Sequence, residues 1–305
     1  MATQPRKLMD IATAQSLWLD SLKAQYVKPS TARHYRLILG QLSAWTASKH
    51  LDLGDLKALH LSQFMASLPI SQNTAITRVK TYKTFFRFCE ENELIQISPA
   101  RNLKAPRYQP PDKRPYSQEE NIAILQACDH IGKPATARLV AKAAILVMRH
   151  HALRISDVAE LRRDAFCPDG FLRLKTIKTG AQIEHPTVPV VIQALDCLPG
   201  AGEYYFQDGQ RKPAYVLNDL SVLLRKVYLL SGVKGAQNHR FRHSRASEIL
   251  LVGGSIADCA RFLGISPRIA EMHYARFMPE HRDRIVALME KLKNRESGNE
   301  ALVVY

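Results

Sequence analysis

The sequence predicts a mainly helical protein with one small antiparallel β-sheet: a helical amino-terminal domain followed by a mixed α+β domain. Apolar residues recur at three- and four-residue spacing through most of residues 11–105, which is the period of amphipathic helices. A basic, proline-rich segment at 106–115 then has the composition of an extended linker. Between Phe171 and Val191 the apolar period shortens to that of strands before helical spacing returns.

These changes divide the 305 residues into four segments, and the length suffices for two domains of ordinary size. We predict a helical domain at 1–105, a linker at 106–115, a second domain at 116–295 and a tail at 296–305. The tail ends in the apolar run 301–305 behind a polar spacer. An apolar tail of this kind favours docking on a neighbouring copy.

Local signals place the elements within both domains. In the first, helical spacing is expected at Ile11–Ala24, Thr31–His50, Leu61–Leu68 and Ile76–Asn92, giving a domain of four or five helices. In the second, Ser117 and Glu120 form a helix start, with helices at about 118–130 and 135–150. Short strands around a turn at Gly180 follow, and helices return from about residue 190.

The charge balance points to a polyanionic partner. Lys and Arg outnumber Asp and Glu by 43 to 28, for a net charge of +15 and a pI near 9.7, which fits nucleic acid or an anionic membrane. The longest apolar stretch, Leu139–Met148, is too short to cross a bilayer and contains Lys142. The amino terminus lacks a hydrophobic signal region, so we expect a cytoplasmic protein with no membrane partner.

Several classes of chemistry lack sequence support. The five cysteines are dispersed without a CxxC pair, which argues against a zinc site or a disulfide framework. No P-loop, GxGxxG or HExxH motif occurs, so ATP, dinucleotide and zincin chemistry are not indicated. We therefore predict a reaction carried by side chains alone, without metal or cofactor.

The first domain has an excess of cations, 17 Lys and Arg against 8 Asp and Glu over residues 1–115. Four of them follow one predicted helix, and we predict that they contact phosphates: Arg78, Lys80, Lys83 and Arg87. The aromatic residues of the same helix are predicted to face the core.

Four short segments of the second domain could carry chemistry. Arg154 follows an apolar helix end, with Asp157 three residues later. The predicted hairpin holds Lys178 and Lys175 near its turn. His239 and Arg242 share a helix face at i and i+3, followed by His243, and a later helix carries Tyr274.

In this order the segments resemble the tyrosine recombinases, or phage integrases, in sequence and in domain plan. The resemblance implies five catalytic residues: Arg154, Lys178, His239, Arg242 and Tyr274. It implies support from Asp157 and His243, with Lys175 as a weaker alternative to Lys178. Two positions depart from the pattern: Ala152 replaces a usual glycine, and Ile265 replaces a His or Trp that contacts the phosphate region.

The resemblance also implies a reaction. Two arginines neutralise a DNA phosphate, Tyr274 attacks it with His239 as base or hydrogen-bond partner, and a hairpin lysine protonates the leaving 5'-oxygen. A 3'-phosphotyrosine forms and is reversed by a 5'-hydroxyl of a second duplex. The implied partners are double-stranded DNA with a specific target site and a homotetramer joined through the tails. Ile265 implies either a lowered activity or dependence on an accessory protein, unless His273 beside the tyrosine takes part of the missing role.

Three other interpretations stay open at this point. Ser255–Phe277 could form a helix-turn-helix of a non-catalytic DNA-binding regulator. A type IB topoisomerase would use the same chemistry as a monomer that relaxes supercoils. An RNA-binding protein is disfavoured because the aromatic platform motifs of RNA-recognition folds are missing from the sequence.

Overall fold

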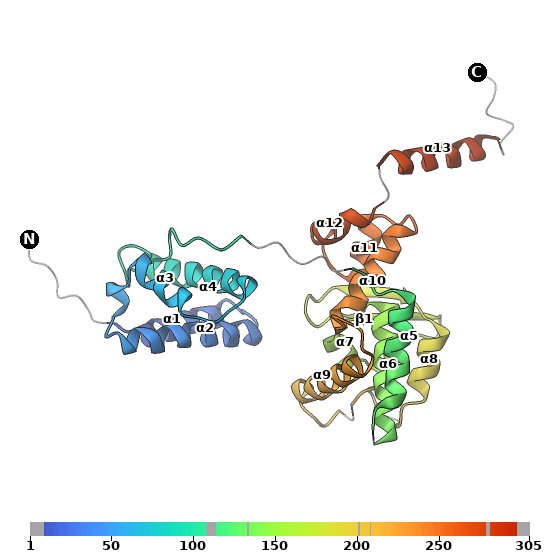
Figure 1. Ribbon diagram of the computed structural model, residues 1–305, viewed down its shortest axis with the longest axis horizontal. Coiled ribbons are helices and arrows are strands. Elements are labelled where there is room, and N and C mark those ends of the chain that lie inside the picture. The colour runs from blue at the N-terminus through green and yellow to red at the C-terminus, as the bar shows by residue number, and fades with distance from the viewer. Residues whose placement is uncertain are drawn as a thin grey trace, which may run out of the picture. The chain divides into compact units, whose positions relative to one another are not determined.

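The computed structural model describes residues 9–107, 114–132, 134–200, 202–207, 209–278 and 281–297. The chain divides into two compact units, residues 1–111 and 112–305, so the boundary falls inside the segment predicted as a linker. The chain is mainly helical (Figure 1), and within the described ranges its second unit contains one two-stranded antiparallel sheet, as the sequence predicted. The predicted docking run, residues 301–305, lies outside the described residues.

The first unit contains four α-helices within residues 9–107: α1 Ile11–Ala24, α2 Pro29–Ser48, α3 Ala58–Ala66 and α4 Gln72–Glu91. A 3₁₀ turn, Leu53–Asp55, joins α2 and α3. The starts follow from the local sequence: Asp10 caps α1, Pro29 occupies the first turn of α2, and Ser71 caps α4.

Aromatic side chains fill the centre of this unit. Tyr82, Phe85 and Phe86 of α4 are fully buried, as predicted, and Phe85 packs against Trp18 of α1 with ring centroids 5.5 Å apart. The same helix therefore has one face directed into the core and another directed to solvent. This division determines which of its cations can reach a ligand.

The second unit begins with α5 Gln118–Ala127, a 3₁₀ turn Cys128–His130, α6 Ala135–His151, α7 Ile155–Ala159 and a 3₁₀ turn Arg163–Ala165. Strands β1 Phe171–Lys175 and β2 Gln182–Pro186 pair with Lys175 opposite Gln182. Strand structure was expected up to Val191, but it ends at Pro186 because Pro189 begins the next helix. The remaining elements are α8 Pro189–Asp196, α9 Pro213–Leu230, α10 Asn238–Leu251, α11 Ile256–Leu263, α12 Pro267–Tyr274, the 3₁₀ turn Ala275–Phe277 and α13 His281–Ser297.

Helix α10 is central to the second unit. It packs against α6 on one side and against α11 and α12 on another (Figure 1). Helix α11 also contacts strand β2. Segments that are far apart in sequence, namely α6, α11 and α12, thus meet around α10, and the hairpin joins them through its contact with α11.

Candidate active site

Arg154 lies at a sharp turn between α6 and α7. Helix α6 is followed by its C-cap residue Ala152, which has a left-handed backbone with φ of 51°. This conformation favours glycine, and a non-glycine residue adopts it at a cost of about 1 kcal/mol. Arg154 then caps α7, with its backbone N–H 3.3 Å from Asp157 Oδ2. Its Nη1 is buried, 4.0 Å from the same carboxylate oxygen, and donates no hydrogen bond to any described group.

Asp157 connects this turn to the hairpin. Its carboxylate is almost fully buried, and Oδ1 accepts a hydrogen bond of 2.9 Å from the backbone N–H of Ile177. The acid predicted to support Arg154 therefore also holds the residue before Lys178. Lys178 and Lys175 themselves are exposed on the hairpin, and Lys175 packs beside Gly180.

Arg242 is the most enclosed cation of the site, with a relative exposure of 4%. Its Nη1 donates to the carbonyl of Ala152 over 2.8 Å, and its Nη2 donates to the carbonyl of Leu263. Burial, reinforced by the charge of Arg154, lowers the pKa of Arg242 to about 10. The guanidinium still carries its charge at neutral pH and is held in one orientation by two backbone groups.

Tyr274, the last residue of α12, is also buried, with 4% exposure. Its hydroxyl lies 2.9 Å from Nδ1 of His243. Burial raises the pKa of Tyr274 to about 12, while the charges of Arg242 and Arg154 oppose that rise. The structure thus brings the predicted nucleophile into the electrostatic range of both predicted arginines.

The hydrogen-bond partner of the phenol differs from our expectation. The sequence favoured His239, whereas the structure places His243 against the hydroxyl. His239 is exposed one turn earlier on α10, and its ring packs edge-on against that of His243 with centroids 4.6 Å apart. The two histidines share a helix face, and only the packing of α12 beside α10 decides which of them reaches Tyr274.

Ile265, at the position of the usual His or Trp, is partly buried against the apolar cluster that contains Leu263 and Tyr274. Its side chain packs but has no hydrogen-bonding atom. Within the described ranges no group of three or more His, Cys, Asp or Glu side chains is placed to hold a metal ion.

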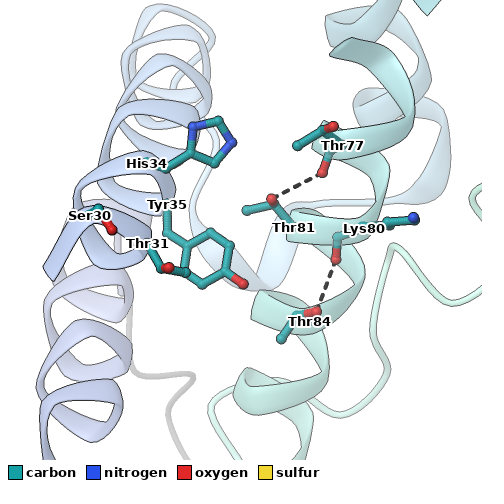
Figure 2. A pocket seen from close by; sticks show the side chains of 8 residues that line it. All are labelled: Ser30, Thr31, His34, Tyr35, Thr77, Lys80, Thr81 and Thr84. Atoms are coloured by element: carbon teal, nitrogen blue, oxygen red, sulfur yellow. Dashed lines mark hydrogen bonds between the residues drawn. The ribbon is translucent and has the colours of Figure 1, made fainter. Parts of the chain in front are cut away.

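The four cations predicted to contact phosphates do not share one face of α4. Arg78, by contrast with the other three, is buried and donates through Nη2 to Gln41 Oε1 on α2, so its guanidinium is engaged inside the unit. Lys80, Lys83 and Arg87 point to solvent. Lys80 borders a hollow of about 390 Å³ between α2 and α4, which Figure 2 shows lined by Ser30, Thr31, His34, Tyr35, Thr77, Lys80, Thr81 and Thr84.

The sequence model of the phage integrase family matches residues 116–281, which is more than half of the chain. The chain belongs to the phage integrase family. Its members, the tyrosine recombinases, are DNA strand-transferring enzymes of site-specific recombination.

Individual relatives agree with this assignment. A tyrosine recombinase XerC of Rhodospirillum centenum is 27% identical over 274 residues, covering 82% of this chain and 78% of the relative. A lambda integrase dimer bound to a COC' core site matches with a TM-score of 0.69 at 18% identity, covering 87% of this chain and 77% of that one. A lambda integrase tetramer bound to a Holliday junction gives 0.67 at 17%, covering 84% and 77%. At these identities the structural likeness establishes the fold.

Two buried histidines beside the recombinase site were not predicted from the sequence. His185 of β2 stacks on Phe262 with centroids 3.8 Å apart, and His151 of α6 lies parallel to His185 at 5.8 Å. Both are 1% exposed, and neither ring nitrogen of His151 has a hydrogen-bond partner among the described residues. In the sequence, His185 alternates with the polar residues Gln182 and Glu184 and so lies on the same strand face as Ile183. This spacing was the one available signal that His185 is buried.

These histidines predict an acid-sensitive fold. Burial lowers the pKa of His151 to about 3 and that of His185 to about 4. The unfolded chain binds protons below its ordinary histidine pKa of about 6.5, whereas the folded chain does not. The free energy of unfolding should therefore fall by about 1.4 kcal/mol per pH unit for each histidine between about pH 6.5 and 4.

Urea titrations at several pH values check this expectation. Burial also lowers the pKa of the neighbouring His150 to about 4, so the variant His185→Phe should flatten the histidine part of the acid decline by about a third. His130→Phe, an exposed histidine of the same unit, should leave the slope unchanged. An equal slope in His185→Phe and the parent protein would contradict the assignment.

Proposed function

We propose that this recombinase cuts and rejoins double-stranded DNA at a specific target site through a 3'-phosphotyrosine bond to Tyr274. One observation carries the assignment of this residue: its hydroxyl meets His243 within the field of Arg242 and Arg154. A phenol needs a proton acceptor and nearby cations before it can attack an anionic phosphate. All three groups are present around this tyrosine.

Each side chain has a distinct role in the proposed step. Nη1 of Arg154 and the donors of Arg242 not held by backbone carbonyls bind the non-bridging phosphate oxygens, whose charge grows in the transition state. Nδ1 of His243 takes the phenol proton as the Tyr274 oxygen bonds to phosphorus. The exposed His239 reaches the phosphate from the preceding turn of α10.

Cleavage also needs a proton for the departing oxygen. As the bond between phosphorus and the 5'-oxygen breaks, the ammonium of Lys178 delivers that proton, with Lys175 as the alternative donor. The phosphotyrosine retains the phosphodiester bond energy. A 5'-hydroxyl from a second duplex can therefore attack it, return the tyrosine and complete the exchange.

We propose that the exposed side of α4 is the part of the first unit that binds DNA. Lys80, Lys83 and Arg87 lie there, and threonine hydroxyls line the adjoining hollow (Figure 2). Long cationic side chains on one helix face suit a run of phosphates.

The triple variant Lys80→Ala, Lys83→Ala, Arg87→Ala is expected to reduce the slope of log affinity against log salt by about 2 to 3, because each lost phosphate contact removes roughly 0.9. Fluorescence anisotropy on a duplex at several salt concentrations measures this slope. Lys23→Ala, an exposed lysine of α1 paired with Asp20, is the control. An unchanged slope in the triple variant would exclude this face.

We further propose that the working unit is a homotetramer on DNA, as in the lambda integrase complex with a Holliday junction. Support comes from α13, whose side chains Ile285, Leu288, Met289 and Leu292 are spaced as one helix face and are all exposed. Docking of α13 and the following tail on a neighbouring copy would cover them. An accessory protein that supplies a donor near Ile265 completes the proposal.

No helix among the described residues is long and apolar enough to cross a membrane. We place the reaction in the cytoplasm, where chromosomal DNA is accessible.

Plasmid pairs carrying the DNA that flanks the coding sequence test the proposed function. Recombinant plasmids, together with an SDS-resistant protein–DNA adduct, are the expected result. Relaxation of supercoils without exchange between plasmids would indicate a type IB topoisomerase. Sequence-specific binding without any adduct would indicate a regulator and overturn the proposal.

A further inference from the structure

Three successive backbone carbonyls at the end of α11 receive hydrogen bonds from three different segments. His185 Nε2 of strand β2 lies 2.8 Å from the carbonyl of Phe262. Arg242 of α10 donates to the carbonyl of Leu263. Thr179 Oγ1 of the hairpin loop donates to the carbonyl of Gly264 over 3.3 Å. Carbonyls at a helix end have no partner within the helix, so side chains from elsewhere can satisfy them.

The hairpin is pressed closely onto this turn. Gly264 has a left-handed backbone with φ of 57°, and a Cβ placed on it would lie 2.9 Å from Ile183 Cγ2 of β2. The ring of His185 stacks on Phe262 with an interplanar angle of 9°. Hairpin and turn are therefore in direct van der Waals contact, which a larger residue at Gly264 would disrupt.

The residues on both sides of Lys178, the catalytic lysine of the proposed mechanism, are held by hydrogen bonds. Thr179 follows Lys178 directly and hydrogen-bonds to the α11 turn, while the N–H of Ile177, which precedes Lys178, is held by Asp157. Asp157 caps the turn of Arg154, and the α11 turn holds Arg242. One neighbour of Lys178 is thus held by the carboxylate that caps the turn of Arg154, and the other by the turn that holds Arg242.

We propose that Thr179 and His185 are positioning residues, which lock the hairpin onto the α11 turn and so place the ammonium of Lys178 at the departing 5'-oxygen. This inference rests on the proposed role of Lys178. The buried His185 supports it in a second way, because its Nδ1 has no hydrogen-bond partner in the described part of the chain. A buried acceptor without a donor destabilises the fold, and a phenylalanine would stack there without that cost.

The tautomer of His185 follows from the same contacts. Burial lowers its pKa to about 4, so the imidazole is neutral at pH 7 and has a single N–H. That N–H must be on Nε2, because Nε2 faces a carbonyl oxygen, which can only accept. The hairpin is therefore held by a directional bond that an aromatic ring alone cannot supply.

A substrate with sulfur in place of the bridging 5'-oxygen isolates the positioning role. A thiolate departs without protonation because its pKa is far below that of an alkoxide, so a misplaced acid matters only for the oxygen substrate. The test measures single-turnover cleavage of nicked duplexes with oxygen or sulfur at this position. Thr179→Val and His185→Phe keep the shape and remove the donor. Thr187→Val, directly after strand β2, is the control, and Lys178→Ala is the reference.

With oxygen, Thr179→Val and His185→Phe should cleave about 10- to 100-fold more slowly than the parent protein. With sulfur, both should cleave within about twofold of it, and Thr187→Val should match the parent on both substrates. The test is valid if the sulfur substrate restores cleavage by Lys178→Ala. In that case, Thr179→Val and His185→Phe would overturn the positioning role if their cleavage rates fell equally on both substrates or on neither.

Failure of Lys178→Ala itself to be rescued would instead remove Lys178 from its proposed role as the acid. Thr179→Val changes a single surface-loop hydroxyl to a methyl group and is expected to fold. It therefore decides the question even if His185→Phe, which alters a buried site, proves unstable.

Discussion

Replacing Tyr274 with phenylalanine is expected to abolish the covalent protein–DNA adduct completely, while affinity for the target duplex stays within about threefold of the parent, a change of under 1 kcal/mol. The reaction needs an oxygen nucleophile at this position, and the variant lacks one. The phenylalanine ring retains the packing of Tyr274 against the apolar cluster of α10–α12. Loss of the bond to His243 should lower stability by only about 1 kcal/mol.

The measurement is an SDS gel of protein incubated with a nicked target duplex labelled on the cleaved strand. Tyr215→Phe provides the matched control, because this tyrosine of α9 is 60% exposed and far in sequence from the site. An adduct that survives in Tyr274→Phe would assign the nucleophile to another residue and invalidate the proposed mechanism.

The raised pKa of Tyr274 has a bearing on when the enzyme is active. With a pKa of about 12, the phenol is protonated at neutral pH in the DNA-free protein. Its proton can leave readily only toward His243 as bond formation to phosphorus begins. The buried and protonated nucleophile should therefore be unreactive until a phosphate lies between the two arginines.

Local sequence signals predicted the elements of this fold well. Helix starts at Ser71 and Ser117 and the hairpin turn at Gly180 follow from capping and turn chemistry within a few residues. The sequence spacing could also have shown which cations of α4 face the core and which face solvent. Arg78 is four residues before the buried Tyr82 and seven before Phe85, on the core face, whereas Lys80, Lys83 and Arg87 are spaced on the other.

Contacts between distant segments could not be predicted in this way. His239 and His243 are equivalent by helical spacing, and the choice between them depends on α12, thirty-one residues beyond His243. The pairing of His185 with Phe262 joins residues 77 positions apart. Family resemblance suggested which residues would meet, but the carbonyls that orient Arg242 and the hairpin are backbone groups, which no residue pattern identifies.

The conservative change Arg242→Lys is expected to slow cleavage by about 10²- to 10³-fold, even though the charge is retained. A lysine cannot hold the carbonyls of Ala152 and Leu263 and still present two forked donors to a phosphate. The same variant should lose about 1–3 kcal/mol of unfolding free energy, because a buried carbonyl is left without a donor.

Single-turnover cleavage and urea denaturation of the same preparation separate these two effects of Arg242→Lys. Arg149→Lys is the control, since Arg149 pairs with Glu248 at a partly exposed site on the neighbouring helix α6. The parent's activity should be retained up to about pH 9 and should fall as the pH rises through 10, because Arg242, whose lowered pKa is about 10, then loses its charge. Near-parental cleavage by Arg242→Lys would show that charge alone suffices at this position. The forked donors would then have no part in stabilising the transition state.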